Sequence, residues 1–101
     1  MKRYVLGFQF TPPGDQVVLE LKQRPRWQSG FWNGIGGKIK KGETSISAMK
    51  RKFQEDTGLD QSKILWSYWG SLQPNKEESI FLFSSFTEEA RTIRTVTDED
   101  V

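Results

Sequence analysis

The chain has 101 residues, of which 35% are hydrophobic and 28% charged, a profile that predicts one globular domain over residues 1–101 with a modest core. It contains neither cysteine nor histidine, which excludes disulfides, thiolate nucleophiles, imidazole bases and metal sites built on sulfur or imidazole ligands. Any metal site must use oxygen ligands, which favours Mg²⁺, Mn²⁺ or Ca²⁺.

The net charge of +2 is unevenly distributed along the chain. Residues 1–52 hold 11 basic and 3 acidic side chains, whereas residues 53–101 hold 4 and 10. Two ordinary solvated surfaces would give this pattern, and so would a basic wall facing an anionic ligand opposite acidic groups that hold a cation. The first residues lack the apolar run of a signal peptide or a membrane span, so a cytoplasmic location is expected.

Residues 3–10 predict a strand, and residues 16–22 predict a second strand that pairs with it as a hairpin. The segment Thr-Pro-Pro-Gly-Asp at 11–15 indicates the turn between them. The large apolar residues of each strand share one face at period two: Tyr4, Leu6, Phe8 and Phe10 in the first, and Val17, Leu19 and Leu21 in the second. Residues 23–34 predict irregular chain.

A glycine-rich segment then leads into a helix predicted over residues 44–57. Thr44 is the expected N-cap, and Gly58 stands where a helix C-terminal glycine belongs. A buried stripe is predicted at helical spacing: Ile46, Met49 and Phe53. Four glycines within nine positions indicate sharp turns or a close approach of the backbone to another group: Gly34, Gly36, Gly37 and Gly42.

Residues 63–72 and 79–87 predict two further strands, with a turn at Pro74-Asn75-Lys76 between them. A short last strand is expected to include Ile93 and Val96. This order of elements predicts an α+β fold, in which a mixed sheet carries one main helix. A second helix would normally cover the other face of the sheet, but the sequence pattern predicts none.

The segment 36–59 contains the candidate functional residues. Its glycines allow backbone N–H groups to reach a phosphate, and neighbouring lysines suit phosphate oxygens: Lys38, Lys40 and Lys41. On the predicted helix, Lys52, Glu55 and Asp56 share one face, where the two carboxylates form a patch suited to Mg²⁺. A metal and lysines around one polyphosphate are what phosphoryl chemistry requires.

This segment resembles the Nudix box, whose pattern is G-x5-E-x7-R-E-U-x-E-E-x-G-U with U a bulky apolar residue. The matching residues are Gly37, Glu43, Arg51, Phe53, Glu55, Gly58 and Leu59. Asp56 is a conservative change from Glu, and Lys52 reverses the charge at a Glu position. The run from Trp32 to Lys38 is similar to the segment before the box in MutT-like enzymes, which sanitise oxidised purine nucleotides.

The resemblance implies a catalytic centre with Mg²⁺ or Mn²⁺ as cofactor. Glu55 and Asp56 would be metal ligands, and Glu43 would support the metal or the loop. Arg51 would orient the neighbouring acidic groups through an ion pair. Glu99 looks like the later glutamate that supplies another ligand or a base in some members.

The resemblance also implies a substrate side. Asn33 would face the base, and Gly36 and Gly37 would lie against the substrate. Lys38 and Lys22 would face the phosphates.

Two departures from the family pattern bear on function. The glutamate that Lys52 replaces binds metal and helps to activate water in some members, whereas a lysine cannot bind metal and repels a nearby cation. Family members also usually continue past the region of Glu99 with a strand and a helix, and this chain stops at Val101. Part of the sheet is then expected to be uncovered, and a homodimer or a partner would cover it.

The leading interpretation is Mg²⁺-dependent hydrolysis of a pyrophosphate bond in a nucleoside diphosphate derivative, with an oxidised nucleotide as a candidate substrate and with Lys52 weakening the reaction. One alternative is a catalytically inactive module that binds nucleotides. Another is a nucleic-acid-binding module that uses the basic half, although the net charge of +2 and the lack of an RNA-binding motif count against it.

Plainer roles remain open for several of these residues. Glu43 would also serve as a helix cap, and Asn33 as a turn former. The lysines before the helix would equally suit a solvated loop. Trp66 and Trp69 are expected in the core and at an interface.

Overall fold

The computed structural model describes residues 1–21 and 32–93, the side chains of Leu21 and Trp32 aside. In chain order the elements are β1 (Lys2–Thr11), β2 (Gln16–Val17), β3 (Glu20–Leu21), β4 (Trp32–Asn33), β5 (Ile35–Lys38), α1 (Ser45–Thr57), β6 (Trp66–Asn75), β7 (Glu78–Phe86) and the 3₁₀ helix η2 (Glu88–Thr92). A mixed five-stranded sheet with one main helix confirms the predicted α+β fold.

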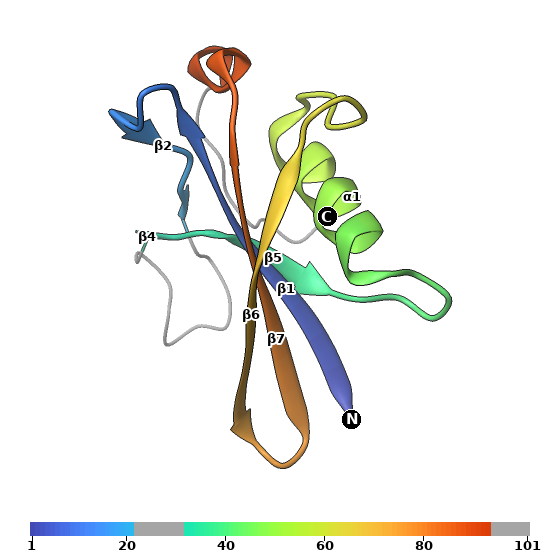
Figure 1. Cartoon of the computed structure of the whole chain (residues 1–101). Coiled ribbons are helices and arrows are strands. Elements are labelled where there is room, and N and C mark those ends of the chain that lie inside the picture. The colour runs from blue at the N-terminus through green and yellow to red at the C-terminus, as the bar shows by residue number, and fades with distance from the viewer. Residues whose placement is uncertain (22–31, 94–101) are drawn as a thin grey trace.

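The strand β1 is the centre of the sheet (Figure 1). One of its edges pairs in parallel with β7 over nine residue pairs, from Lys2 and Glu78 to Phe10 and Phe86. Its other edge pairs antiparallel with β5 and then with β2, which confirms the predicted hairpin between the first two strands. The strand β6 continues the sheet antiparallel to β7, while β3 and β4 form a separate two-stranded ladder.

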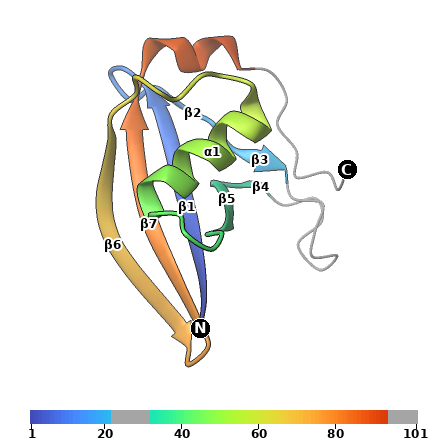
Figure 2. The same ribbon diagram turned by 90° about the vertical axis from the view of Figure 1, so that its right-hand side faces the viewer.

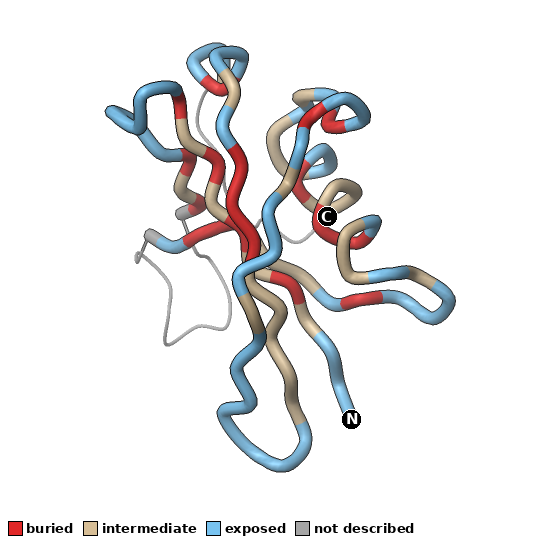
Figure 3. The backbone as a smooth tube through the Cα atoms, in the orientation of Figure 1, coloured by how far each residue is buried: buried red, intermediate tan, exposed pale blue. Residues whose placement is uncertain are grey.

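The helix α1 packs on one side of the sheet, against β5 and β1 (Figure 2). The residues of β1 that are buried under it alternate along the strand: Val5, Gly7, Gln9 and Thr11 (Figure 3). The predicted face of Tyr4, Leu6, Phe8 and Phe10 exists, but its residues are only partly buried because α1 lies on the opposite face. A Cβ at Gly7 would lie 2.6 Å from Met49 Sδ, so the helix approaches the strand closely at this glycine.

The helix itself is formed as predicted. Thr44 caps it through its side chain, which accepts a hydrogen bond from the backbone N–H of Ser47, and Gly58 ends it with a φ of 77°. Met49 and Phe53 are fully buried, and Ile46 packs partly buried against the same core. Phe53 also meets Trp66 edge to face, with ring centroids 5.2 Å apart, so Trp66 belongs to the core side as expected.

The second predicted strand is broken, and its predicted inward face is wrong. The chain pairs with β1 at Gln16 and Val17 and then turns away to pair as β3 with β4. Val18 and Glu20 are buried, whereas Val17 is exposed. Val17 pairs with Phe10 and therefore lies on the face of the sheet opposite α1, where it is not covered.

The last two strands are shifted relative to the prediction. The strand β6 runs on to Asn75, so the turn falls at Lys76 and Glu77 rather than at 74–76. A β-bulge at Trp69, followed by Gly70 at a φ of 139°, directs Trp69 to the face opposite α1. There it donates a hydrogen bond to Ser84 Oγ and is 71% exposed.

The face opposite α1 carries a group of apolar side chains: Phe8, Phe10, Trp69, Leu82 and Phe86. Phe10 and Phe86 stack there with ring centroids 5.3 Å apart. Within residues 1–21 and 32–93, α1 is the one α-helix, and it covers the other side. Coverage of this face by a second copy of the chain stays a prediction.

The prediction of a last strand at Ile93 is wrong, and Val96 lies outside the described residues. After β7 the chain forms η2, which Thr87 caps by accepting a hydrogen bond from the backbone N–H of Glu89. Two acidic residues follow this cap directly, which suits the start of a helical turn better than a strand. No helix in the described ranges is long and apolar enough to cross a membrane.

A buried amide network joins the segment after α1 to the sheet. Gln9 Nε2 donates to Gln61 Oε1 at 2.9 Å and to Ser85 Oγ at 3.0 Å. Trp66 Nε1 also donates to Gln61 Oε1, and Gln61 Nε2 donates to the carbonyl of Leu59. These bonds tie the segment after α1 to β1, β6 and β7, although Gln9 Oε1 is buried without a hydrogen-bond partner among the described residues.

The packing predicts a large difference between two phenylalanines. Replacing the fully buried Phe53 with Ala leaves a cavity between α1 and the sheet, and should lower the free energy of unfolding by about 3–5 kcal/mol. Phe86→Ala is the matched control, because Phe86 is 57% exposed and should cost about 1 kcal/mol. Urea denaturation followed by circular dichroism measures both. Equal losses would contradict the assigned core.

Candidate functional site

The loop between β5 and α1 is closed by Glu43. Gly42 turns the chain with a φ of 87°, which brings Glu43 back towards the end of β5. Glu43 Oε1 then accepts a hydrogen bond from the backbone N–H of Lys40 at 2.8 Å. The helix cap is Thr44, so Glu43 does not have the alternative role of a cap.

Arg51 joins the helix to this loop. Its Nε donates to Glu43 Oε2 at 2.6 Å, and its two terminal nitrogens donate to Glu55 Oε1 at 3.2 Å and to the carbonyl of Lys38 at 3.1 Å. The planar guanidinium thus holds two carboxylates and one backbone carbonyl in a fixed arrangement. These are the contacts expected of a residue that orients acidic groups, and its part in catalysis stays a prediction.

The hydrogen bonds from Arg51 and from the backbone N–H of Lys40 lower the pKa of Glu43 to about 2, from an ordinary value of 4.5. The same contact with Glu43 is the main cause of a raised pKa for Arg51, to which Glu55 contributes. Glu43 is therefore ionised at neutral pH, and its negative charge is balanced by the guanidinium of Arg51.

Lys52 and Asp56 form an ion pair one turn apart on the helix. Lys52 Nζ lies 3.1 Å from Asp56 Oδ1, and the two side chains are 26% and 10% exposed. Asp56 Oδ2 is buried and has no hydrogen-bond partner among the described residues. Their spacing predicts that both residues share one face of the helix, and the same i, i+4 spacing is the signal for the ion pair, which was not predicted.

Gly37 makes room for Lys52. A Cβ at position 37 would lie 2.8 Å from Lys52 Cδ and 3.0 Å from its Cε and Cγ. The aliphatic part of the lysine therefore runs directly against the backbone of β5. This contact fixes where the ammonium stands.

Two of the four glycines lie in a strand, where the backbone makes the close approach that their spacing indicates. Gly36 and Gly37 lie in β5, opposite Leu6 and Val5 of β1. A Cβ at Gly36 would lie 2.6 Å from the carbonyl oxygen of Val5, so glycine serves close strand packing here. Their contact with a substrate stays a prediction.

The remaining predicted substrate residues are Asn33, Lys38 and Lys22. Asn33 is exposed at the end of β4, and its Oδ1 accepts a hydrogen bond from the backbone N–H of Gly34 at 2.7 Å, so its contact with a base stays a prediction. Lys38 is exposed at the end of β5. Lys22 lies outside the described residues, and so does Glu99, the glutamate expected to supply another metal ligand or a base. Residues 23–31 also lie outside them.

The described residues do not fit a resident divalent cation. No group of three or more acidic side chains that would hold a metal occurs within residues 1–21 and 32–93. Glu43 and Glu55 are both bonded to Arg51, and Asp56 is paired with Lys52. The metal-ligand roles of Glu55 and Asp56 therefore stay predictions.

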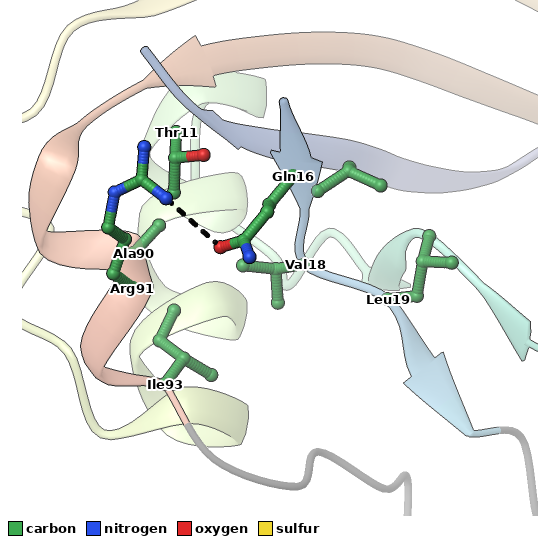
Figure 4. Close-up of a pocket in the computed structure, with 8 residues that line it drawn as sticks. Thr11, Gln16, Val18, Leu19, Ala90, Arg91 and Ile93 are labelled. Atoms are coloured by element: carbon green, nitrogen blue, oxygen red, sulfur yellow. Dashed lines mark hydrogen bonds between the residues drawn. The ribbon is translucent and has the colours of Figure 1, made fainter. Parts of the chain in front are cut away.

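A separate hollow lies between β2 and η2 (Figure 4). None of its residues was predicted from the sequence to belong to a functional site. Arg91 is its charged group, and it donates to Gln16 and Asp15 and pairs with Glu88. We place the candidate site at the segment 36–59 instead, where Lys52 and Asp56 lie beside the carboxylates that Arg51 holds.

The low pKa of Glu43 predicts how stability depends on pH. Because the pKa is lower in the folded chain, the stabilisation is complete above pH 4.5 and is lost as the pH falls towards 2. Wild type should therefore be more stable than Glu43→Gln near neutral pH, with the difference shrinking at acid pH. Urea midpoints measured across this range provide the test. Glu77→Gln, at an exposed turn, is the control, and a constant gap for Glu43→Gln would contradict the assignment.

Comparisons with known proteins agree with this geometry. The family model described as the NUDIX domain matches residues 2–101. The oxidized purine nucleoside triphosphate hydrolase of Mus musculus is 43% identical over 56 residues, which cover 55% of this chain and 34% of that protein. The 8-oxo-dGTP diphosphatase of Buchnera aphidicola is 31% identical over 61 residues, 59% of this chain and 49% of that protein. The matched part thus spans from about a third to half of these relatives.

Solved structures share the fold. A MutT structure from work on the Aliivibrio salmonicida and Vibrio cholerae proteins has a TM-score of 0.71 at 20% identity, covering 83% of this chain and 64% of that one. The dihydroneopterin triphosphate pyrophosphohydrolase of E. coli has a TM-score of 0.73 at 14% identity, covering 92% of this chain and 73% of that one. With a family model that matches nearly the whole sequence and a sheet and helix arranged as in these proteins, this chain belongs to the Nudix superfamily.

Proposed function

We propose that this domain binds a nucleoside diphosphate derivative beside Gly37 and α1, and that Lys52 leaves it with little or no hydrolysis of the pyrophosphate bond. The observation that carries this proposal is the ion pair between Lys52 Nζ and Asp56 Oδ1 at 3.1 Å. It stands where the Nudix pattern has two acidic residues. A carboxylate bound to an ammonium is a poor ligand for Mg²⁺.

The electrostatic cost of a metal at this position is large. Two like unit charges 4 Å apart repel each other by about 4 kcal/mol at an effective dielectric of 20, and a divalent ion doubles this value. Lys52 and a divalent cation therefore compete for Asp56.

The class of ligand is supported by the relatives. The mouse and Buchnera proteins are named for oxidised purine nucleotides, and the E. coli protein for dihydroneopterin triphosphate. All three names describe a fused ring joined to a chain of phosphates. We therefore favour an oxidised purine nucleotide as the first ligand to test, with ADP-ribose and dinucleoside polyphosphates as further candidates.

Reversing the charge at Lys52 should restore hydrolysis. In Lys52→Glu the ammonium is removed and a third carboxylate joins Glu55 and Asp56, which gives the oxygen ligands that Mg²⁺ prefers. Pyrophosphate or phosphate release in the presence of Mg²⁺ should rise by about 10²-fold or more over wild type. Lys76→Glu, the same charge change on an exposed residue of the turn between β6 and β7, should leave the rate unchanged.

Two results would contradict the proposal. Wild-type turnover as fast as that of Lys52→Glu would show that Lys52 does not suppress the reaction. Turnover by wild type that persists in Glu55→Ala would show that the reaction takes place elsewhere.

A further inference from the structure

We infer that the ammonium of Lys52 takes the place of a divalent cation at this site, so that the domain binds the diphosphate group of its ligand without a metal. The nucleotide part of the ligand rests on the proposed function above. The inference itself concerns only the charge, the position and the surroundings of Lys52.

The position of the ammonium is set by packing. The lysine stem lies against Gly37, where even a methyl group would come within 2.8 Å of it, and Asp56 holds the other end at 3.1 Å. A long lysine side chain fixed at both ends has already lost much of its rotational freedom. Binding a ligand oxygen then costs less entropy than it would at a free surface lysine.

Asp56 shows that a cation belongs at this site. Its side chain is nine-tenths buried, and Oδ2 has no hydrogen-bond partner among the described residues. A buried carboxylate is costly without a counter-charge, and Lys52 supplies that charge. An ammonium has three N–H donors, and Asp56 is its ion-pair partner in the described part of the chain, so two donors remain for ligand oxygens.

The charge of the whole segment leads to the same conclusion. Residues 36–57 contain six basic and three acidic side chains, a net charge of +3. The substitution Lys52→Glu would reduce this net charge to +1, and one bound divalent cation would bring it back to +3. Wild type without a metal therefore has the same net charge in this segment as the Lys52→Glu variant with one divalent cation bound. Charge-assisted hydrogen bonds from lysine are a common means of holding phosphate oxygens.

Isothermal titration with inorganic pyrophosphate and with ADP, in EDTA and then in Mg²⁺, tests the inference. Wild type should bind both probes in EDTA, and Mg²⁺ should not tighten the binding. Lys52→Met keeps the aliphatic stem and should weaken binding in EDTA by about 10- to 100-fold, as expected for loss of a charged hydrogen bond. Lys63→Met, at an exposed lysine outside the segment, is the control and should bind like wild type.

Two further variants keep the test sharp. Lys52→Glu should bind pyrophosphate only when Mg²⁺ is present, and Mg²⁺ alone should raise its melting temperature while leaving that of wild type unchanged. If Lys52→Met is unstable because Asp56 is left without a counter-charge, Lys52→Met combined with Asp56→Asn removes that charge and should still lose binding in EDTA.

The outcomes separate this inference from the proposed function. Binding of ADP by wild type only in the presence of Mg²⁺ would overturn the inference and leave the proposed function standing. Binding of pyrophosphate but not of nucleotides in EDTA would support the inference and overturn the nucleotide assignment. Retention of wild-type affinity in EDTA by the Lys52→Met variants would overturn the inference, and no binding under either condition would overturn both.

Discussion

The close approach of α1 to β1 is the constraint on which the rest of the structure depends. Gly7 has no side chain where Met49 meets the strand, and a Cβ there would lie 2.6 Å from the sulfur. Met49 and Phe53 are consequently fully buried between helix and sheet. Since the helix cannot slide or rotate without opening this contact, the residues on its outer faces are held at set distances from β5.

The second consequence is that helix and loop behave as one unit. Arg51 lies two residues before Phe53 and bonds Glu43, Glu55 and the carbonyl of Lys38 from its fixed position. Arg51 uses four of its five N–H donors in bonds to Glu43, Glu55 and the carbonyl of Lys38, so it organises the site and has little capacity left for a ligand. Lys52 differs in this respect, because its ion pair with Asp56 in the described part of the chain leaves two of its three N–H donors.

Arg51 and Lys52 therefore have different roles in this segment. Arg51 forms ion pairs with Glu43 and Glu55, two acidic residues of the Nudix pattern. Lys52 forms an ion pair with the remaining one, Asp56. A single reversal of charge alters the net charge of the segment by two, which is the charge of a divalent cation. In the proposed function, this one substitution exchanges an affinity for metal for an affinity for anions.

The sequence by itself determined the local elements and the family. The cap at Thr44, the buried stripe of α1, the end at Gly58 and the spacing of the Nudix box all depend on residues within one or two helical turns. Only the tertiary structure decided which face of β1 is buried, where the second strand breaks, and that Gly36 and Gly37 form a strand. These features depend on which segment packs on which face, and alternation along a strand is the same for either choice. For the same reason, spacing placed Lys52 beside Asp56 but could not show that Gly37 holds the lysine there.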